Sequence, residues 1–440
     1  MGLGARLRRT ETFRAFRHRN YRYLWLGQTG QSATLWMDQV ARAVLILQLT
    51  DDSPVALSAV IATRLAPTLL FGLLAGAIAD RFNRKRLLIG TQSTTMLTHL
   101  AMGLLAVAGV IETWHVFAAA FVAGSAQAFN QPVRQSMIPL VVPREDLMNA
   151  VALNSSAVSF MRIGGGSAAG LLLIPFDVGE VYLCIVAIFV GVIASTFALD
   201  IPGESTRKRS QTGIVAEVRE GFAYVGRNPD LGLVTALAVI LFVFGFPYQQ
   251  VFVPLLATDT LDLGDSGVGF LAGATGAGAF TGSLIVAARG SKRPGVQLML
   301  NMMVFGSALI IISLQQTVIG TALLLALAGA MTVTYMAFTN SILLANSDPE
   351  MHGRVMSLLS LDRGLIPLGA IAAGLLADSI GVRPGLGTMG AIVLVASGVS
   401  LLAFGRRLGA ITTSGEPLRR GHTPAPPPAA EAEPQAAGTS

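Results

Sequence analysis

The chain contains 440 residues, of which 52% are apolar and only 13% are charged, and its mean hydropathy is +0.61. Soluble globular proteins carry about 25% charged residues, so this composition excludes a string of soluble domains and predicts a polytopic membrane protein. The formal net charge is +6, but the basic residues follow membrane loops, so we expect no nucleic-acid partner. A single cysteine, Cys184, excludes an internal disulfide, and without Cys/His clusters we expect no metal or cofactor.

Twelve stretches of the sequence are long and apolar enough to cross a hydrocarbon core of about 30 Å. In chain order they cover residues 21–49, 54–79, 87–110, 114–139, 148–175, 180–200, 231–258, 267–288, 295–314, 317–344, 355–379 and 386–405. The sequence therefore predicts an all-α membrane protein with twelve transmembrane helices.

The charges of the loops predict the orientation of these helices, because short loops rich in Lys and Arg stay in the cytoplasm. The side that carries both chain ends also holds Arg81, Arg84, Lys85, Arg86, Arg134, Arg144, Arg207, Lys208, Arg209, Arg219, Arg227, Arg289, Lys292, Arg293, Arg354, Arg406, Arg407, Arg419 and Arg420. The other side holds the basic Arg383 and the acidic Asp51, Asp52, Glu112, Asp177, Glu180, Asp259, Asp262 and Asp265. Both termini are therefore predicted to be cytoplasmic.

An internal repeat divides the chain into two parallel six-helix bundles. Gly76–Arg86 has a degenerate counterpart in Gly282–Arg293, and Pro143 has one in Pro349 at nearly the same offset. We expect a cytoplasmic arm at 1–20, bundles at 21–201 and 231–408, a cytoplasmic loop at 202–230, and a disordered proline-rich tail at 409–440. Such folds rock their halves around a cavity near the middle of the membrane.

The segment GAIADRFNRKR from Gly76, between the second and third spans, resembles motif A of the major facilitator superfamily. The resemblance implies a gating role for Gly72, Gly76, Asp80, Arg81, Arg84 and Lys85, with Asp362 and Arg363 as the facing part of an inner gate. The spacing of the glycines suits close helix contact, and the carboxylate suits the positive end of a helix. The alternative is that the basic residues only fix the topology.

Three longer stretches resemble the enterobactin-exporter and macrolide-efflux-like branch of that superfamily. They are FRHRNYRYLWLGQ from Phe16, the run from Ala128 to Asn154, and GRVMSLLSLDRGLIPLGAIAAG from Gly353. The resemblance implies a monomeric multi-pass exporter of the bacterial cytoplasmic membrane, commonly driven by protons, for hydrophobic drugs or siderophore-like metabolites. An uptake carrier, an uncoupled facilitator and a non-transporting sensor of the same fold remain alternatives.

Ionisable side chains at membrane depth are costly and mark pathways or ion pairs. Asp38 and Arg42 share a helix face, and Arg64 lies at a similar depth in the second span. We interpret Asp38 as the proton carrier, with Arg42, Arg64 and Arg162 as its charge relay. A static ion pair that fixes helix packing is the alternative. Arg162 has two further possible partners, Asp362 and a substrate anion, whereas His99 is expected to be a packing residue.

In the superfamily that the motif resembles, the first, fourth, seventh and tenth spans line the cavity. Here they offer Gln127, Asn130, Gln131, Phe242, Phe246, Tyr248, Gln249, Gln250, Met331, Tyr335, Phe338 and Asn340. Aromatic, methionine and amide side chains suit a bulky, largely apolar ligand. The alternative for each aromatic residue is packing between helices.

Rival functions lack their sequence signatures. A nucleotide-driven pump needs a phosphate-binding G-x-x-x-x-G-K-[ST] loop, and none of the three lysines lies in one. H-E-x-x-H and G-x-S-x-G motifs are also missing, which argues against a membrane-embedded hydrolase. The sequence therefore predicts a secondary transporter, not an enzyme.

Overall fold

The computed structural model describes residues 11–79, 83–200, 223–289, 294–347 and 364–410, and these described segments are helical. The N-terminal half contains η1 (Glu11–Arg17), α2 (Arg19–Leu49), α3 (Pro54–Ala79), α4 (Arg84–Val107), α5 (Thr113–Val141), η2 (Arg144–Asp146), α6 (Leu147–Leu172) and α7 (Val178–Phe197). The C-terminal half contains α9 (Pro229–Ile240), η3 (Leu241–Gly245), η4 (Tyr248–Phe252), α10 (Val253–Leu255), η5 (Leu256–Thr260), α11 (Gly264–Arg289), α12 (Pro294–Leu314), α13 (Val318–Ala345), α15 (Ile366–Ile380) and α16 (Val382–Ala410).

Each of the twelve predicted spans corresponds to a helix or a helical run, which confirms the all-helical fold. The eleventh span is described from Ile366 onward, because its first residues lie outside the described part. By length and composition, seven of the described helical segments could cross a membrane. Large apolar side chains such as Leu402, which is 90% exposed, cover the outer perimeter, as a lipid-facing surface requires.

The seventh span differs from the regular helix that its sequence predicts, because it contains three π-helical turns. Phe246 N–H donates to the carbonyl of Leu241, and Leu261 N–H donates to that of Leu256, each five residues back. Pro247 and Pro254 lie within this run and supply no backbone N–H, which interrupts the regular ladder.

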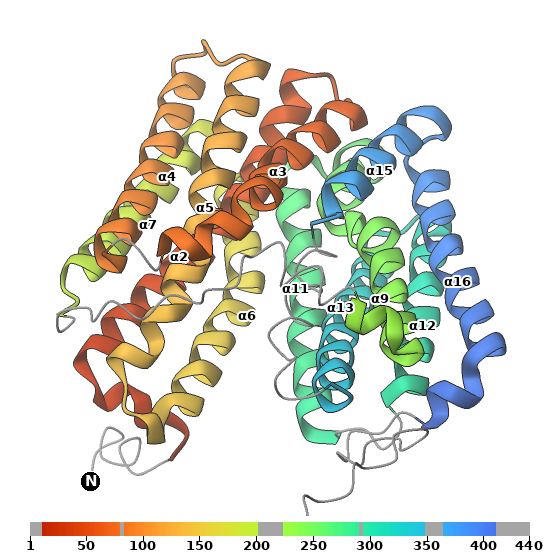
Figure 1. Cartoon of the computed structure of the whole chain (residues 1–440). Coiled ribbons are helices and arrows are strands. Elements are labelled where there is room, and N and C mark those ends of the chain that lie inside the picture. The colour runs from red at the N-terminus through yellow and green to blue at the C-terminus, as the bar shows by residue number, and fades with distance from the viewer. Residues whose placement is uncertain (1–10, 80–82, 201–222, 290–293, 348–363, 411–440) are drawn as a thin grey trace, which may run out of the picture.

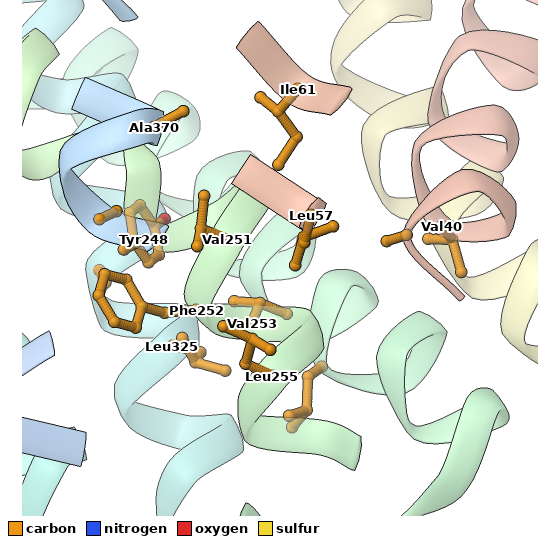
Figure 2. Close-up of a cluster of buried hydrophobic side chains, with 14 of the residues drawn as sticks. Val40, Leu57, Ile61, Tyr248, Val251, Phe252, Val253, Leu255, Leu325 and Ala370 are labelled. Carbon is orange, nitrogen blue, oxygen red and sulfur yellow. The ribbon is translucent and has the colours of Figure 1, made fainter. Parts of the chain in front are cut away.

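Figure 1 shows α2–α7 as one group and α9–α16 as a second, as the two-bundle fold predicts. The two groups meet where α3 packs against α15 and α6 packs against α11. Figure 2 shows part of one buried core cluster to which both halves contribute: it labels Leu57 and Ile61 of α3 together with Tyr248, Val251, Phe252, Val253, Leu255 and Leu325 of the second half. The predicted domain boundaries stay predictions.

Glycines allow the two halves to approach closely at one end of the molecule. A Cβ atom added to Gly170, near the end of α6, would lie 2.7 Å from Cα of Gly269, near the start of α11. In the same region, the Gln48 side-chain amide donates to Asp265 at 2.7 Å. These contacts lie at the helix ends remote from the arginine-rich loops. The halves are therefore closed against each other at the predicted outer face.

Candidate functional site

Asp38 lies in the middle of α2 and joins three helices of the N-terminal half. Arg42, one helical turn further, donates to its Oδ2, and Nε of Arg64 from α3 lies 3.4 Å from the same oxygen. On the other side of the carboxylate, Nε2 of His99 from α4 lies 3.2 Å from Oδ1. We call these four residues the Asp38 cluster. The structure therefore brings together three residues that the sequence placed at similar depth and adds a fourth.

His99 is the member of the cluster that the sequence interpretation missed. Its Nδ1 donates to the backbone carbonyl of Thr95 at 2.6 Å, which fixes the orientation of the ring. The ring also packs near Tyr182 and Phe189 of α7, at centroid distances of 5.7 and 5.6 Å. His99 is thus the packing residue that the sequence predicts and also a direct partner of Asp38.

A cavity of about 250 Å³ adjoins the cluster at the junction of the two halves. Its walls are Leu35, Trp36, Gln39, Arg42, Ala43, Leu57, Val60, Ile61, Arg64, Leu65, Thr68, Gly124, Gln127 and Gln250. Gln250 comes from η4 of the C-terminal half, and the other residues come from α2, α3 and α5. The cavity is therefore apolar along much of its wall and carries two guanidinium and three amide groups.

Two smaller voids of about 10 Å³ each touch both Asp38 and His99. A void of this size is close to the space that one water molecule needs. One of them is also lined by Arg64 and Gln127, which face the larger cavity. A void about the size of one water molecule therefore lies between the Asp38 carboxylate and the larger cavity.

Arg162 of α6 contacts Trp36, a residue of the cavity wall. Its guanidinium carbon is 5.1 Å from the centre of the indole ring, and its buried Nε has no hydrogen-bond partner among the described residues. This is the stacked geometry in which an aromatic face stabilises a cation. Asp362, which the sequence offered as a partner, lies outside the described residues, and so does Arg363.

The remaining predicted cavity residues fall into three groups. Gln131 accepts a hydrogen bond from Gln127 at 3.3 Å and so extends the amide side of the cavity. Asn130 is buried within the N-terminal half, where it donates to Thr91 of α4 at 3.2 Å. Residues that pack within the C-terminal half, apart from the cavity wall, are Phe242, Phe246, Tyr248, Met331, Tyr335 and Phe338. Gln249 and Asn340 are half-buried and also apart from that wall.

The predicted gate is described in part. Gly72 and Gly76 lie in α3, and their surroundings are not described. Asp80 and Arg81 lie outside the described residues. Arg84 begins α4. Lys85 donates to the backbone carbonyl of Phe197 at 2.8 Å, so its ammonium group lies at the C-terminal end of α7. This position favours a cation, and the gating role stays a prediction.

The chain segment before α2 is attached to the connection between α5 and α6. Nε2 of His18 lies 2.8 Å from Oδ2 of Asp146, and Nε of Arg14 lies 3.3 Å from Oδ1. The hydrogen bond from His18, followed by the charge of Arg14, lowers the pKa of Asp146 below its usual value. No sequence pattern indicated this pairing, because its partners are more than 120 residues apart.

Comparisons with known proteins agree with this architecture. A family model described as transmembrane secretion effector, MFS_3, matches residues 10–430. Macrolide efflux protein A of Streptococcus pyogenes is 24% identical over 364 residues, which cover 80% of this chain and 89% of that protein. The staphyloferrin A transporter of Staphylococcus aureus is 24% identical over 360 residues, which cover 81% and 89%.

Solved transporter structures share the fold at low sequence identity. A POT family transporter in complex with 5-aminolevulinic acid has a TM-score of 0.72 and 10% identity, and the match covers 89% of this chain and 97% of that one. A variant of the nucleoside transporter NupG has a TM-score of 0.71 and 11% identity, with coverage of 88% and 100%. These matches confirm the fold.

Proposed function

Because this chain belongs to the MFS_3 family of transmembrane secretion effectors, a family of major facilitator transporters and not of enzymes, we propose that it is a proton-coupled exporter. Its substrate is a small hydrophobic molecule of the drug-like or siderophore-like kind, and its membrane is the bacterial cytoplasmic membrane. The names of two relatives, a macrolide efflux protein and a staphyloferrin A transporter, support this substrate class. Each chain contains both halves, so a single copy suffices for alternating access.

The observation that carries the proposal is a buried carboxylate beside a cavity between the halves. Asp38 is 4% exposed and contacts Arg42, Arg64 and His99, while Arg42 and Arg64 also form part of the cavity wall. An ionised carboxylate in such a site depends on its cationic partners, so substrate or water near the two arginines changes how firmly Asp38 binds a proton. Occupancy of the cavity and protonation of Asp38 are thereby coupled.

Closure at the predicted outer face supports an inward-facing state. The contacts of Gly170 with Gly269 and of Gln48 with Asp265 join the halves at that end. In alternating access these contacts separate when the transporter opens outward. Substrate then enters from the cytoplasm, and a proton enters from outside after the outer contacts open.

Accumulation of radiolabelled 1-naphthylacetate, a small hydrophobic organic anion, in cells with and without the protein tests the proposal. We expect lower accumulation in cells that make the protein, and we expect an uncoupler to abolish the difference. Higher accumulation with the protein would favour the alternative, an uptake carrier. Equal final accumulation with and without the protein, reached faster when the protein is present, would favour an uncoupled facilitator.

A further inference from the structure

We propose that the cavity selects organic anions, with the acidic group of the substrate held by Arg42 and Arg64. The proposal rests on the proposed function only in taking this cavity as the substrate site. Arg42 and Arg64 both contact Oδ2 of Asp38, so one carboxylate faces two guanidinium groups. Among the described residues, Asp38 is the acidic partner of both arginines.

The excess positive charge is buried. The side chains of Arg42 and Arg64 are 10% and 13% exposed, and both belong to predicted membrane spans. A cation in such a place is costly unless an anion accompanies it. His99, on the opposite oxygen of Asp38, contributes no negative charge in either of its protonation states. The cluster therefore lacks at least one negative charge, which a bound substrate supplies.

The cavity wall presents donors and no competing acid. A guanidinium group carries five N–H donors, and each arginine directs one nitrogen to Asp38 while forming part of the cavity wall. None of the fourteen described residues of this wall is Asp or Glu. Gln39, Gln127 and Gln250 add amide groups, whose N–H atoms also suit the oxygens of a carboxylate.

The rest of the wall suits the apolar body of the same ligand. Leu57, Val60 and Ile61 of α3 form an aliphatic side, and the indole of Trp36 forms an aromatic one. Arg162 stacks on that indole, and among the described residues no carboxylate forms an ion pair with it. A third cation therefore adds to the positive potential beside the cavity. A cationic ligand meets repulsion here, and a neutral ligand leaves the excess charge uncompensated.

Three ligands with the same aromatic body and different charge test the proposal: 1-naphthylacetate, 1-naphthylacetamide and 1-naphthylmethylamine. Their affinities for the purified full-length protein are measured by isothermal titration calorimetry in detergent at neutral pH. We expect the anion to bind at least about tenfold more tightly than the amide, and the cation to bind most weakly, because charge-assisted hydrogen bonds are the stronger ones. Equal affinities, or tightest binding of the cation, would overturn the proposal.

Variants with effects of opposite sign separate charge recognition from damage to the fold. Arg64→Gln is expected to lower the affinity for the anion to that of the amide, whereas Arg64→Lys keeps a preference for the anion. Asp38→Asn removes the internal competitor for both guanidinium groups and is expected to raise the affinity for the anion. The matched control is Arg227→Gln, which removes a charge from an exposed position and is expected to change nothing. Loss of anion binding in both Arg64→Gln and Asp38→Asn would indicate structural damage and contradict anion selection.

Binding in detergent requires no proton gradient, so this result is independent of the direction and coupling of transport. Preference for the anion in a protein that does not export would refute the proposed function and leave the inference intact. Proton-driven export with no preference for the anion would refute the inference and leave the proposed function intact.

Discussion

Nε2 of His99 lies 3.2 Å from Oδ1 of Asp38, across the carboxylate from the two arginines that hold Oδ2. Because Nδ1 of the same ring donates to the Thr95 carbonyl, the imidazole is tied at both ends. The histidine thus positions the carboxylate on the side that the arginines leave free. The pair connects α2 to α4, and the arginines connect α2 to α3, so one side chain ties three helices together.

Replacement of His99 tests its part in holding Asp38. His99→Phe keeps the aromatic packing with Tyr182 and Phe189 but leaves Oδ1 without its partner. A buried acceptor without a partner costs about 1–3 kcal/mol, so we expect the free energy of unfolding to fall by about that amount. Unfolding of the purified protein in detergent, followed by intrinsic fluorescence, measures the change.

His99→Gln supplies an amide donor and is expected to recover part of that loss. Leu97→Phe places the same aromatic side chain on a neighbouring exposed position of α4 and is the matched control. Equal stability of His99→Phe and the wild type would show that the histidine does not hold the carboxylate.

The glycine contact between α6 and α11 predicts how the outer closure can be disrupted. A side chain at Gly269 meets the backbone of Gly170, so Gly269→Leu should separate the two helices and favour an outward-open state. Cysteines at Gln48 and Asp265, in a Cys184→Ser background, report the closure through a short thiol-specific crosslinker. We expect the crosslinking yield to fall at least about twofold, because even a Cβ atom added at Gly269 would lie 2.3 Å from Cα of Gly170 in the closed state.

Gly191→Leu is the control for this experiment, because a Cβ atom at that position of α7 has no atom within 4 Å. An unchanged yield in Gly269→Leu would mean that the glycine contact does not control the closure.

Asp146 predicts a dependence of stability on pH. Its pKa is lowered in the folded state by the hydrogen bond from His18 and by Arg14, relative to about 3.9 in an unfolded chain. A group with a lowered folded pKa stabilises the protein above the unfolded value, and that stabilisation is lost as the pH falls through the folded pKa. We therefore expect Asp146→Asn to be less stable than the wild type between about pH 5 and 7, with a difference that shrinks on acidification below about pH 4.

Thermal unfolding of both proteins in detergent at a series of pH values measures this difference. A constant difference between Asp146→Asn and the wild type down to pH 3 would show that ionisation of Asp146 is not the cause.

The sequence could predict two kinds of feature: contacts between residues on one helix, and helices that follow from a long apolar stretch. Asp38 and Arg42 are four residues apart on one helix, so their pairing follows from helical geometry. Arg64 was predicted from its depth in the neighbouring span. The twelve spans follow from apolar length alone, because lipid tolerates few other spanning structures.

Contacts that depend on the rotation of a helix about its axis could not be predicted in the same way. Asn130 and Gln127 are three residues apart on α5, yet one faces α4 and the other the cavity. Both faces of such a helix are apolar in a membrane, so periodicity does not separate inside from outside. The same ambiguity concealed His99, whose contact with Asp38 depends on how α4 is rotated against α2.

Transport by inside-out membrane vesicles tests most directly whether Asp38 couples protons to export. Vesicles acidified inside by respiration are supplied with radiolabelled 1-naphthylacetate, and its uptake is compared in the wild type and in Asp38→Asn. We expect proton-driven uptake in the wild type, loss of it in Asp38→Asn, and continued exchange of labelled for unlabelled 1-naphthylacetate in the variant. Full uptake driven by the proton gradient in Asp38→Asn would contradict the assignment of Asp38 as the proton carrier.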